Sequence, residues 1–419
     1  MYYIGIDLGT TCCKCILFDG EGKVKYVFNE EMPINHFGDK TEQSAFTWLD
    51  TVIRGLREIV QNNKNCDIVS LSLSTQGISF VITNKNYEPL SYAISWLDTR
   101  AKAEYNEIIR EFSAEKLEKT CGLYPTDCYV FPKLLWLKKH KATLLKKGNK
   151  IMTALDFLNA RLTGKAVIDY TMAGGTMLLN IEKRSWEKRF LDYLGISENQ
   201  LSELATIGSF VGELSEEICE KTGLKNVKVY LGGQDQKLAA IGGGIKENVI
   251  TVSLGTSTAV SVINVKPNKE FKKFIFNDRD YIYEAALSTT GASIRWLKEV
   301  LGLNSYEEMD ELAEKAGSSD GISFSADFVD GAEIKGLKLG HEKGNIIYAL
   351  YEGIAKQIKR LIKDLDKKHT VRLFGGGAKS KILCNIIEKN IGREIACSKM
   401  VETAAYGAAI IAENGFKTK

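Results

Sequence analysis

The feature that most constrains this chain is a short motif that occurs twice. Leu8-Gly9-Thr10-Thr11 ends an alternating segment at residues 3–8, and Leu254-Gly255-Thr256-Ser257 ends a similar segment at residues 249–254. A second strand-like segment follows each motif, at residues 14–18 and 259–263, so each motif predicts a β-hairpin with glycine in its turn. Two such hairpins, each opening one half of the chain, predict a duplicated fold with facing phosphate loops.

The length of 419 residues supports this division, because single hydrophobic cores stop growing near roughly 250 to 300 residues. We expect two domains, residues 1–244 and 245–419, with a cleft between them as the place to look for a ligand. Strand-like and helical segments alternate in both halves, which predicts an α/β fold. Strands are expected at 23–29, 68–73, 227–231 and 371–374, and helices from Ser44 and near 101–118, 133–145, 154–162, 294–301, 346–365, 382–389 and 404–412.

Composition excludes several classes of protein. Lys plus Arg is 56 and Asp plus Glu is 53, and the resulting charge of +3 is spread along the chain, which argues against nucleic acid as the main partner. No apolar run approaches the roughly 20 residues of a membrane helix. Nine scattered cysteines fit a reducing, cytoplasmic location better than a disulfide framework. Cys12 and Cys15 form a C-x-x-C spacing, which we interpret as structural, with a redox or metal role as the alternative.

The first candidate site is Asp7-Leu8-Gly9-Thr10-Thr11, with Lys14 close behind. Glycine lets backbone amides approach a phosphate closely, the threonines add hydroxyl donors, and the lysine adds a countercharge. An Asp beside a Gly-Thr turn can equally be only a turn. The repeat at Gly255-Thr256-Ser257 favours phosphate binding.

A third glycine cluster, Gly375-Gly376-Gly377-Ala378, lies between a predicted strand and a predicted helix. Bare backbone at a helix N-terminus suits a nucleotide, and a loose strand-to-helix connection is the alternative. None of the glycine clusters has the spacing of a P-loop or of a dinucleotide-binding fingerprint.

Two further segments carry polar groups after predicted strands. Gly232-Gly233-Gln234-Asp235-Gln236 places a carboxylate at the predicted domain junction, where Asp235 can face a substrate hydroxyl or cap the next helix. Gln76 follows another strand, and Trp96, Asp98 and Arg100 precede a helix. These groups can bind hydroxyls and pack against a sugar ring, and the alternative is an N-capping Asp98 beside a buried Trp96.

These motifs, in this order, resemble the FGGY family of carbohydrate kinases over nearly the whole chain. The segments similar to family motifs are 7–14 and 253–258 for phosphate, 96–100 for sugar, 232–236 for the catalytic Asp, 290–296 and 375–380 for adenosine, and the signature segments 133–137 and 336–353.

The resemblance implies a duplicated two-domain actin-like ATPase fold, ribonuclease H-like in each domain, with ATP and Mg²⁺ in the cleft and a sugar or polyol on the N-terminal domain. Asp235 would be the general base, and Asp7 and Asp235 would hold the metal. Gln76, Trp96, Asp98 and Arg100 would form part of the sugar site. The residues that would contact ATP are Gly9, Thr10, Thr11, Lys14, Gly255, Thr256, Gly291, Gly376, Gly377, Ala378 and Asn385.

We therefore predict ATP-dependent phosphorylation of a primary hydroxyl of a small sugar or polyol, with a pentulose such as xylulose favoured. Where xylulokinases usually carry Gln-Met-His-Gly, this chain has Gln76-Gly77-Ile78-Ser79, so gluconate, glycerol, ribulose and hexuloses stay open as substrates. An actin-like ATPase and a sugar-binding regulator without efficient turnover are the rival functions. The sequence does not fix the oligomeric state, with a homodimer among the options.

Overall fold

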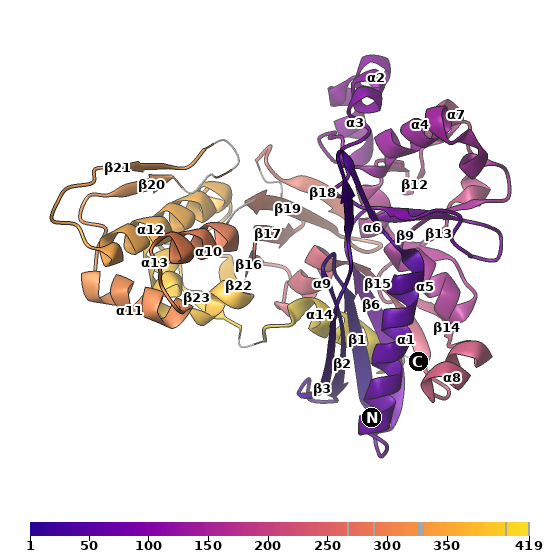
Figure 1. The fold of residues 1–419 in the computed structure, drawn as a ribbon, viewed down its shortest axis with the longest axis horizontal. Coiled ribbons are helices and arrows are strands. Elements are labelled where there is room, and N and C mark those ends of the chain that lie inside the picture. Colours follow the sequence, from indigo (N-terminus) through magenta and orange to yellow (C-terminus); the bar gives the residue numbers. More distant parts are fainter. Residues whose placement is uncertain (266–267, 288–289, 326–327, 329–330, 399, 418–419) are drawn as a thin grey trace. The chain divides into compact units, whose positions relative to one another are not determined.

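The computed structural model describes residues 1–265, 268–287, 290–325, 328, 331–398 and 400–417. Contacts divide the chain into two compact units, each with its own sheet and helices (Figure 1). Unit 1 contains Met1–Gly242, Lys273–Tyr281 and Ala404–Lys419, and unit 2 contains Gly243–Lys272 and Ile282–Thr403. The sequence analysis predicted one domain boundary, at residue 244. The contacts differ from this division because they also assign the last helix of the chain to unit 1.

The main sheet of unit 1 joins an antiparallel meander to parallel strands. β1 pairs antiparallel with β2, and β2 with β3, whereas β6 runs parallel to both β1 and β15. This arrangement contains the predicted first hairpin. The sheet order is β14 (Phe210–Glu213), β15 (Lys228–Gln234), β6 (Ile68–Thr75), β1 (Tyr2–Leu8), β2 (Cys12–Asp19) and β3 (Val24–Glu31).

One face of this sheet is covered by α1 (Ala45–Asn62), whose apolar residues recur at helical spacing. Ser44 caps the helix as predicted, because its side chain accepts a hydrogen bond from the Thr47 amide. Gly55 of α1 faces Cys15 of β2, which stands opposite Ile6 of β1. The face of β1 that carries Ile6 is therefore the α1 face.

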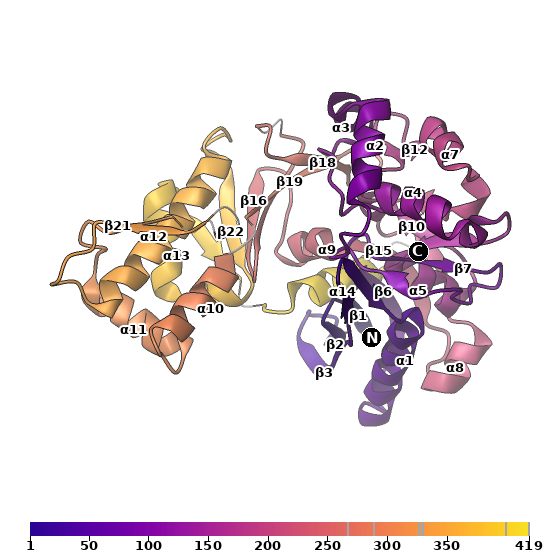
Figure 2. The ribbon, with the colours of Figure 1, turned by 45° about the horizontal axis from the view of Figure 1, so that its top comes forward.

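The other face of the sheet is covered by α14 (Thr403–Lys417), although this helix is last in the chain (yellow in Figures 1 and 2). A Cβ atom on Gly5 would lie 1.8 Å from the Ala405 carbonyl oxygen, so helix and strand are in backbone contact. Ser70 of β6 also donates to the Ala412 carbonyl at 2.9 Å. Because side chains alternate along a strand, Asp7 points to the same face as Gly5.

Unit 2 repeats the strand arrangement of unit 1. β16 forms an antiparallel hairpin with β17, β17 pairs antiparallel with β19, and β22 and β23 extend the sheet in parallel. The order β19-β17-β16-β22-β23 therefore matches β3-β2-β1-β6-β15. The bounds are β16 (Val249–Leu254), β17 (Thr258–Ile263), β19 (Tyr281–Leu287), β22 (Thr370–Phe374) and β23 (Ile395–Cys397).

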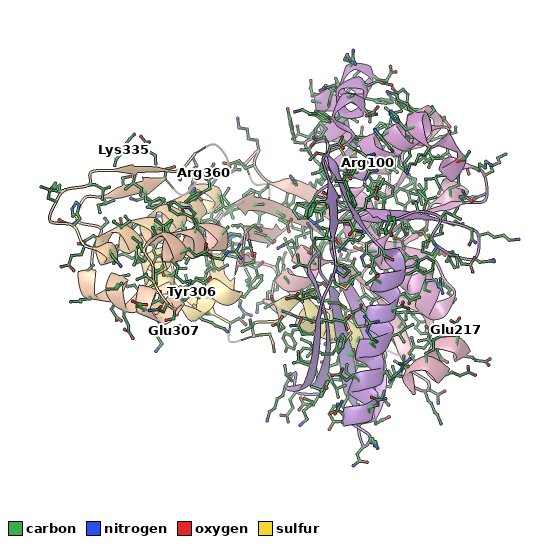
Figure 3. All side chains as sticks on the ribbon, viewed as in Figure 1. Arg100, Glu217, Tyr306, Glu307, Lys335 and Arg360 are labelled. Atoms are coloured by element: carbon green, nitrogen blue, oxygen red, sulfur yellow. The ribbon has the colours of Figure 1, made fainter. Side chains whose placement is uncertain are left out.

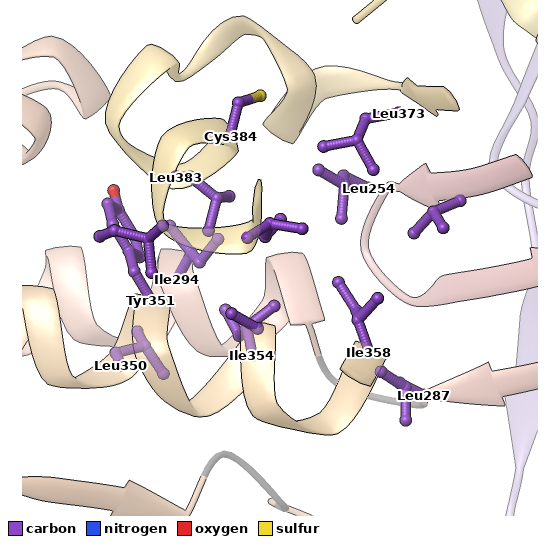
Figure 4. Packing of buried hydrophobic residues seen from close by; sticks show 14 of the residues in the cluster. Leu254, Leu287, Ile294, Leu350, Tyr351, Ile354, Ile358, Leu373, Leu383 and Cys384 are labelled. Carbon is purple, nitrogen blue, oxygen red and sulfur yellow. The ribbon is translucent and has the colours of Figure 1, made fainter. Parts of the chain in front are cut away.

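The core of unit 2 lies between this sheet and the helices. Leu254 and Leu373 from the strands, Ile354 and Ile358 from α12, and Leu383 from α13 belong to one buried cluster (Figure 4). Burial of such side chains is worth about 1.5–3 kcal/mol each. The helices of unit 2 are α10 (Thr290–Val300), α11 (Tyr306–Ala316), α12 (Lys343–Ile362) and α13 (Lys381–Ile391).

The remaining elements lie mostly in unit 1. A second sheet has the order β4 (Asn35–Phe37), β5 (Lys40–Gln43), β8 (Ala93–Ile94), β7 (Phe80–Thr83) and β9 (Lys150–Thr153). Its helices are α2 (Lys102–Phe112), α3 (Ala114–Cys121), α4 (Val130–His140), α5 (Ala154–Thr163), α6 (Tyr170–Gly175), α7 (Lys188–Leu194), α8 (Glu216–Thr222) and α9 (Asp235–Gly242). Short strands are β10 (Val167–Asp169), β11 (Leu179–Asn180), β12 (Ser185–Trp186), β13 (Glu203–Ala205), β18 (Lys272–Ile275) and, in unit 2, β20 (Ser323–Ser325) and β21 (Glu333–Lys335).

One predicted helix is divided into two. The helix predicted near 101–118 breaks at Ser113, which has a φ of 58° and caps α3 through the Lys116 amide.

None of the nine cysteines, all of which lie in described segments, forms a disulfide bond. Cys12 and Cys15 point to opposite faces of β2 because they stand three residues apart on a strand. Within the described residues, no helix is long and apolar enough to cross a membrane.

The contact between Gly5 and α14 gives a direct test of the fold. We expect Gly5→Ala to lower the free energy of unfolding by about 3 kcal/mol or more, because its methyl group would overlap the Ala405 carbonyl. Gly20→Ala is the matched control, since nothing lies within 4 Å of a Cβ atom there. Urea denaturation measures both variants, and equal stabilities would contradict the packing of α14 on β1.

Candidate functional site

Parallel pairing brings the carboxyl ends of β1, β6 and β15 to one edge of the sheet. The register places Asp7 beside Ser74, and Ser74 beside Gly233, while Lys14 of β2 stands opposite Asp7. Ser74 Oγ donates to Asp7 Oδ1 at 2.7 Å. Asp7 is therefore held between a hydroxyl donor and a lysine at the edge where open α/β sheets bind ligands.

Asp235 lies at the same edge, as the first residue of α9 directly after β15. The β15 register is irregular between Tyr230 and Gly233, a distortion common next to functional sites. Asp235 Oδ1 accepts from the Gln236 amide at 2.8 Å, and its side chain is only partly buried. The carboxylate thus stabilises the start of a helix in a residue that is only partly buried, so the two roles expected for Asp235 are compatible.

The turn between β15 and α9 is supported by Asp169 and Thr171. The Gln234 amide donates to Thr171 Oγ1 at 3.3 Å, and Thr171 Oγ1 donates to Asp169 Oδ2 at 2.5 Å. Burial raises the pKa of Asp169 to about 6, and the hydrogen bonds from Thr171 and the charge of Lys237 offset part of that increase. Buried Lys237 places Nζ 3.7 Å from the ring centre of Phe274.

The loop after β1 contacts the predicted sugar segment. The Gly9 amide bonds to the Cys12 carbonyl at 2.9 Å, which closes the hairpin turn and leaves Thr11 exposed. Trp96 Nε1 donates to Thr10 Oγ1 at 2.9 Å. The Trp96 side chain is exposed, at 40%, so the buried alternative for this residue is wrong. The predicted phosphate loop and the predicted sugar segment are therefore in contact in unit 1.

Asp98 and Arg100 form a buried ion pair at the start of the helical segment. Arg100 Nε bonds to both Asp98 oxygens, and Arg100 Nη2 bonds to Asp98 at 2.6 Å and to Glu42 at 2.7 Å. The guanidinium also lies over the Trp136 ring, 5.1 Å from its centre. Asp98 does not cap α2, since the N-cap residue is Ala101 and has no side-chain cap bond. Figure 3 labels Arg100 within unit 1.

Gln76 and Lys133 are also buried close to Trp96. Gln76 is 1% exposed, and its amide bonds to Gln43 and to Ser79. Lys133 of α4 donates to the Ser95 carbonyl at 2.8 Å and to the Trp96 carbonyl at 3.4 Å. Burial lowers the pKa of Lys133 to about 8, and the nearby charges of Cys128 and Asp98 limit the shift.

In unit 2 the repeated motif is exposed at the turn between β16 and β17. Gly255 and Thr256 reach solvent, and their carbonyls accept from the Gly291 and Ala292 amides at 3.0 and 3.1 Å. A Cβ atom on Gly291 would lie 2.2 Å from the Gly255 carbonyl oxygen, so this helix start requires glycine. The predicted phosphate loop and the N-terminus of α10 are therefore one structural element.

The third glycine cluster packs on the same end of β16. Gly375 has a φ of 90°, and a Cβ atom added there or at Gly377 would lie 3.1 or 2.9 Å from Leu254, whereas nothing lies within 4 Å of a Cβ atom at Gly376. Ala378 follows in the short 3-10 helix at 376–379, and Asn385 is exposed on α13. The backbone of this loop is therefore accessible in unit 2.

The start of α13 is fixed by a carboxylate that the sequence did not suggest. Asp310 Oδ1 accepts from Ser380 Oγ at 2.9 Å and from Tyr351 Oη at 2.7 Å. Burial and the Asp310 charge raise the pKa of Tyr351. Sequence reasoning likewise passed over Gln43, Glu42 and Asp169, because each is an isolated polar residue in no motif. An Asp followed two residues later by Thr, at 169–171, is a capping pattern that could have indicated Asp169.

The buried ion pair between Asp98 and Arg100 should contribute more to stability than an exposed ion pair does. Arg100→Met should lower the free energy of unfolding by about 3–5 kcal/mol, because it leaves the fully buried Asp98 carboxylate without a cation. Arg54→Met is the control, since Arg54 and Glu30 pair at the surface, where such pairs contribute about 0–1 kcal/mol. Urea denaturation of both variants gives the comparison. Similar small losses would show that Asp98 and Arg100 do not depend on one another.

The raised pKa of Asp169 predicts a pH-dependent stability. Between its ordinary pKa of 3.8 and about 6, the unfolded chain ionises while the folded carboxyl keeps its proton, so stability falls as the pH rises. Asp169→Asn cannot titrate. The unfolding free energy of the wild type minus that of the variant should therefore fall by roughly 3 kcal/mol from about pH 3.5 to about pH 7. Asp50→Asn, at an exposed position of α1, is the control, and a flat difference for Asp169→Asn would contradict the raised pKa.

Two family models together match most of the chain. The model of the FGGY family of carbohydrate kinases, N-terminal domain, matches residues 2–242, and the C-terminal domain model matches residues 250–413. A xylulose kinase of Bacillus subtilis is 29% identical over 440 residues, covering 99% of this chain and 88% of that protein. A gluconokinase of the same species is 24% identical over 445 residues, covering 98% and 86%. A glycerol kinase of Thermococcus onnurineus is 27% identical over 447 residues, covering 98% and 88%.

Solved structures show the same fold. The ligand-bound xylulose kinase of Lactobacillus acidophilus has a TM-score of 0.91 at 24% identity, covering all of this chain and 90% of that chain. The glycerol kinase of Plasmodium falciparum with ADP has a TM-score of 0.91 at 22% identity, with the same coverage. The chain therefore belongs to the FGGY family of carbohydrate kinases, and it is a phosphotransferase with the two-domain, actin-like α/β fold.

Proposed function

We propose that this enzyme transfers the γ-phosphoryl group of ATP to a primary hydroxyl of a small sugar or polyol, with a pentulose such as xylulose the favoured acceptor. The relatives named xylulose kinase support a pentulose. Gluconate, glycerol, ribulose and hexuloses are the other candidates, because a gluconokinase and a glycerol kinase are similar to this chain at comparable identity. Nine described cysteines without a disulfide among them support a reducing, cytoplasmic location.

The observation that carries the proposal is the position of Asp235. This carboxylate begins α9 at the carboxyl edge of the sheet that also holds Asp7, and its side chain is only partly buried. A general base must reach the proton that it removes, so an edge position suits the role better than a core position. The support from Thr171 fixes the turn on which Asp235 sits.

The proposed reaction is an in-line displacement. The sugar hydroxyl oxygen bonds to the γ-phosphorus as the bond from that phosphorus to the bridging oxygen of ADP breaks, and Asp235 accepts the hydroxyl proton. Phosphoryl transfer depends chiefly on positioning and on neutralising charge, so the phosphate loops supply more of the catalysis than the base does. The base contributes typically about 10²- to 10⁴-fold.

The polar residues of unit 1 fit a magnesium ion. Mg²⁺ is usually held by one or two carboxylates, with water and substrate phosphates as its other ligands. Asp7, oriented by Ser74, and Asp235 would provide such a pair of carboxylates from the two sides of β6 at one edge of the sheet. No cluster of three or more His, Cys, Asp or Glu groups that could hold a metal ion occurs among the described residues. Mg²⁺ would neutralise charge on the transferred phosphoryl group.

The exposure of each candidate residue guides the substrate contact that we propose for it. We assign the triphosphate to the loop residues Gly9, Thr10 and Thr11, with Lys14, and to Gly255 and Thr256 of unit 2. Trp96 would pack against the sugar ring, because its indole is exposed. Gln76, Asp98 and Arg100 would shape the sugar site from beneath, since their polar atoms bond within the protein. The residues assigned to adenosine are Gly291, Gly376, Gly377, Ala378 and Asn385.

ADP release over a panel of sugars and polyols tests the proposed reaction. We expect one pentulose or a related compound to stimulate ADP release and to become phosphorylated. An ATPase would release ADP without an acceptor, and a regulator would bind sugar without turnover. Failure of every compound in the panel to accept phosphate would reject the proposed function.

Replacing the proposed base gives a second test. Asp235→Asn should lower kcat by about 10²-fold or more, because the variant loses the carboxylate that would accept the proton and help to hold Mg²⁺, while the phosphate loops retain most of the affinity for ATP. Glu216→Gln removes an exposed acid from the first turn of α8 and is the matched control. Steady-state kinetics with the best acceptor and ATP titration measure both quantities. Near-normal turnover of Asp235→Asn would remove Asp235 from this role.

A further inference from the structure

A closed ring of hydrogen bonds joins the phosphate loop of unit 1 to the exposed tryptophan. It passes from Thr10 through three buried polar side chains to Trp96 and returns to Thr10 through the indole. The bonds are Gln43 Nε2 to the Thr10 carbonyl at 2.7 Å, Gln76 Nε2 to Gln43 Oε1 at 2.8 Å, Ser79 Oγ to Gln76 Oε1 at 3.0 Å, the Trp96 amide to Ser79 Oγ at 3.1 Å and Trp96 Nε1 to Thr10 Oγ1 at 2.9 Å.

The chemistry of the neighbouring groups fixes the direction of this ring. The Thr10 carbonyl can only accept, and the Trp48 indole, which bonds to Gln43 at 3.3 Å, can only donate. The Gln43 amide nitrogen must therefore face Thr10, and its oxygen must face Trp48 and Gln76. Gln43 is 1% exposed, so a reversed amide would leave buried groups unsatisfied at a cost of about 1–3 kcal/mol each.

The ring determines how the Thr10 hydroxyl can form hydrogen bonds and where the Trp96 indole lies. Because Thr10 Oγ1 accepts from the Trp96 indole, the Thr10 hydroxyl keeps its own proton to donate to a phosphate oxygen. The backbone of Trp96 is held at its amide by Ser79 and at its carbonyl by Lys133. The indole platform and the phosphate loop are thus parts of one hydrogen-bonded frame.

We infer that Gln43 is a positioning residue that holds the Thr10 phosphate loop and the Trp96 sugar platform in register with each other. It acts through Gln76 and Ser79, and its neighbour Glu42 on β5 points to the opposite face, toward Arg100. This inference rests on the proposed function, because the register matters only if Thr10 meets phosphate and Trp96 meets sugar. A misplacement of about 1 Å between reacting groups can cost about 10²-fold in rate.

Two variants open the ring at different points. Gln43→Met keeps the length of the side chain and removes the bonds to Thr10 and Gln76, and Ser79→Ala removes one hydroxyl between Gln76 and Trp96. Gln200→Met is the matched control, because Gln200 is also a buried glutamine of unit 1 whose amide bonds to backbone carbonyls, those of Leu145 and Lys146. If Gln43→Met fails to fold, Ser79→Ala decides, since it deletes a single oxygen.

We expect each ring variant to lower kcat with the best acceptor by about 10- to 100-fold and to raise the ratio of ADP released to sugar phosphate formed. The double variant should be no slower than the less active single variant, because both changes open the same ring. Multiplying effects, or kinetics like those of Gln200→Met, would overturn the inference. A wild-type enzyme that phosphorylates nothing in the panel would instead reject the proposed function.

A crossed hydrogen-exchange measurement tests the ring without any substrate. Gln43→Met should speed exchange at the Trp96 amide, and Ser79→Ala should speed exchange in the peptide covering residues 8–12, each by about 10-fold. Gln200→Met should change neither. Exchange that rises only beside the substituted residue would show that the two ends of the ring are not coupled.

Discussion

The parallel pairing of β6 with β1 and with β15 is the constraint on which the candidate site depends. Parallel strands end at the same edge, so residues far apart in sequence, Asp7, Ser74 and Asp235, are brought to one edge of unit 1. The antiparallel hairpin adds Lys14 opposite Asp7. Unit 2 repeats the pairing with β16 and β22, which brings the Gly255 turn and the Gly375 loop to a common edge.

Buried polar groups hold the backbone of the exposed candidate residues in place. The Asp98 and Arg100 pair, the Asp169 and Thr171 support and the ring through Gln43 lie behind the exposed groups and hold their backbone. Desolvating such groups is costly, and it is offset only when every donor and acceptor is satisfied. These hydrogen bonds restrict the backbone of the candidate residues, and phosphoryl transfer depends chiefly on such positioning.

The structure separates three residues that the sequence analysis grouped in one predicted sugar site. Trp96, Asp98 and Arg100 were expected to act together on a sugar, yet only Trp96 is substantially exposed, while Asp98 and Arg100 bond to each other and Arg100 also bonds to Glu42. A motif shows which residues occur together. It does not distinguish a side chain that touches a ligand from one that supports it, because burial depends on segments elsewhere in the chain.

By itself the sequence determined the two glycine-threonine hairpins, the alternation of strands and helices, and the positions of Asp7 at the end of one strand and of Asp235 after another, because turn chemistry and periodicity are local properties. Only the tertiary structure decided that α14 packs on β1, that Gln43 bonds to Thr10 and that Asp310 holds the start of α13. These are contacts between distant segments. Their geometry follows from sheet register and helix packing, which no local pattern specifies.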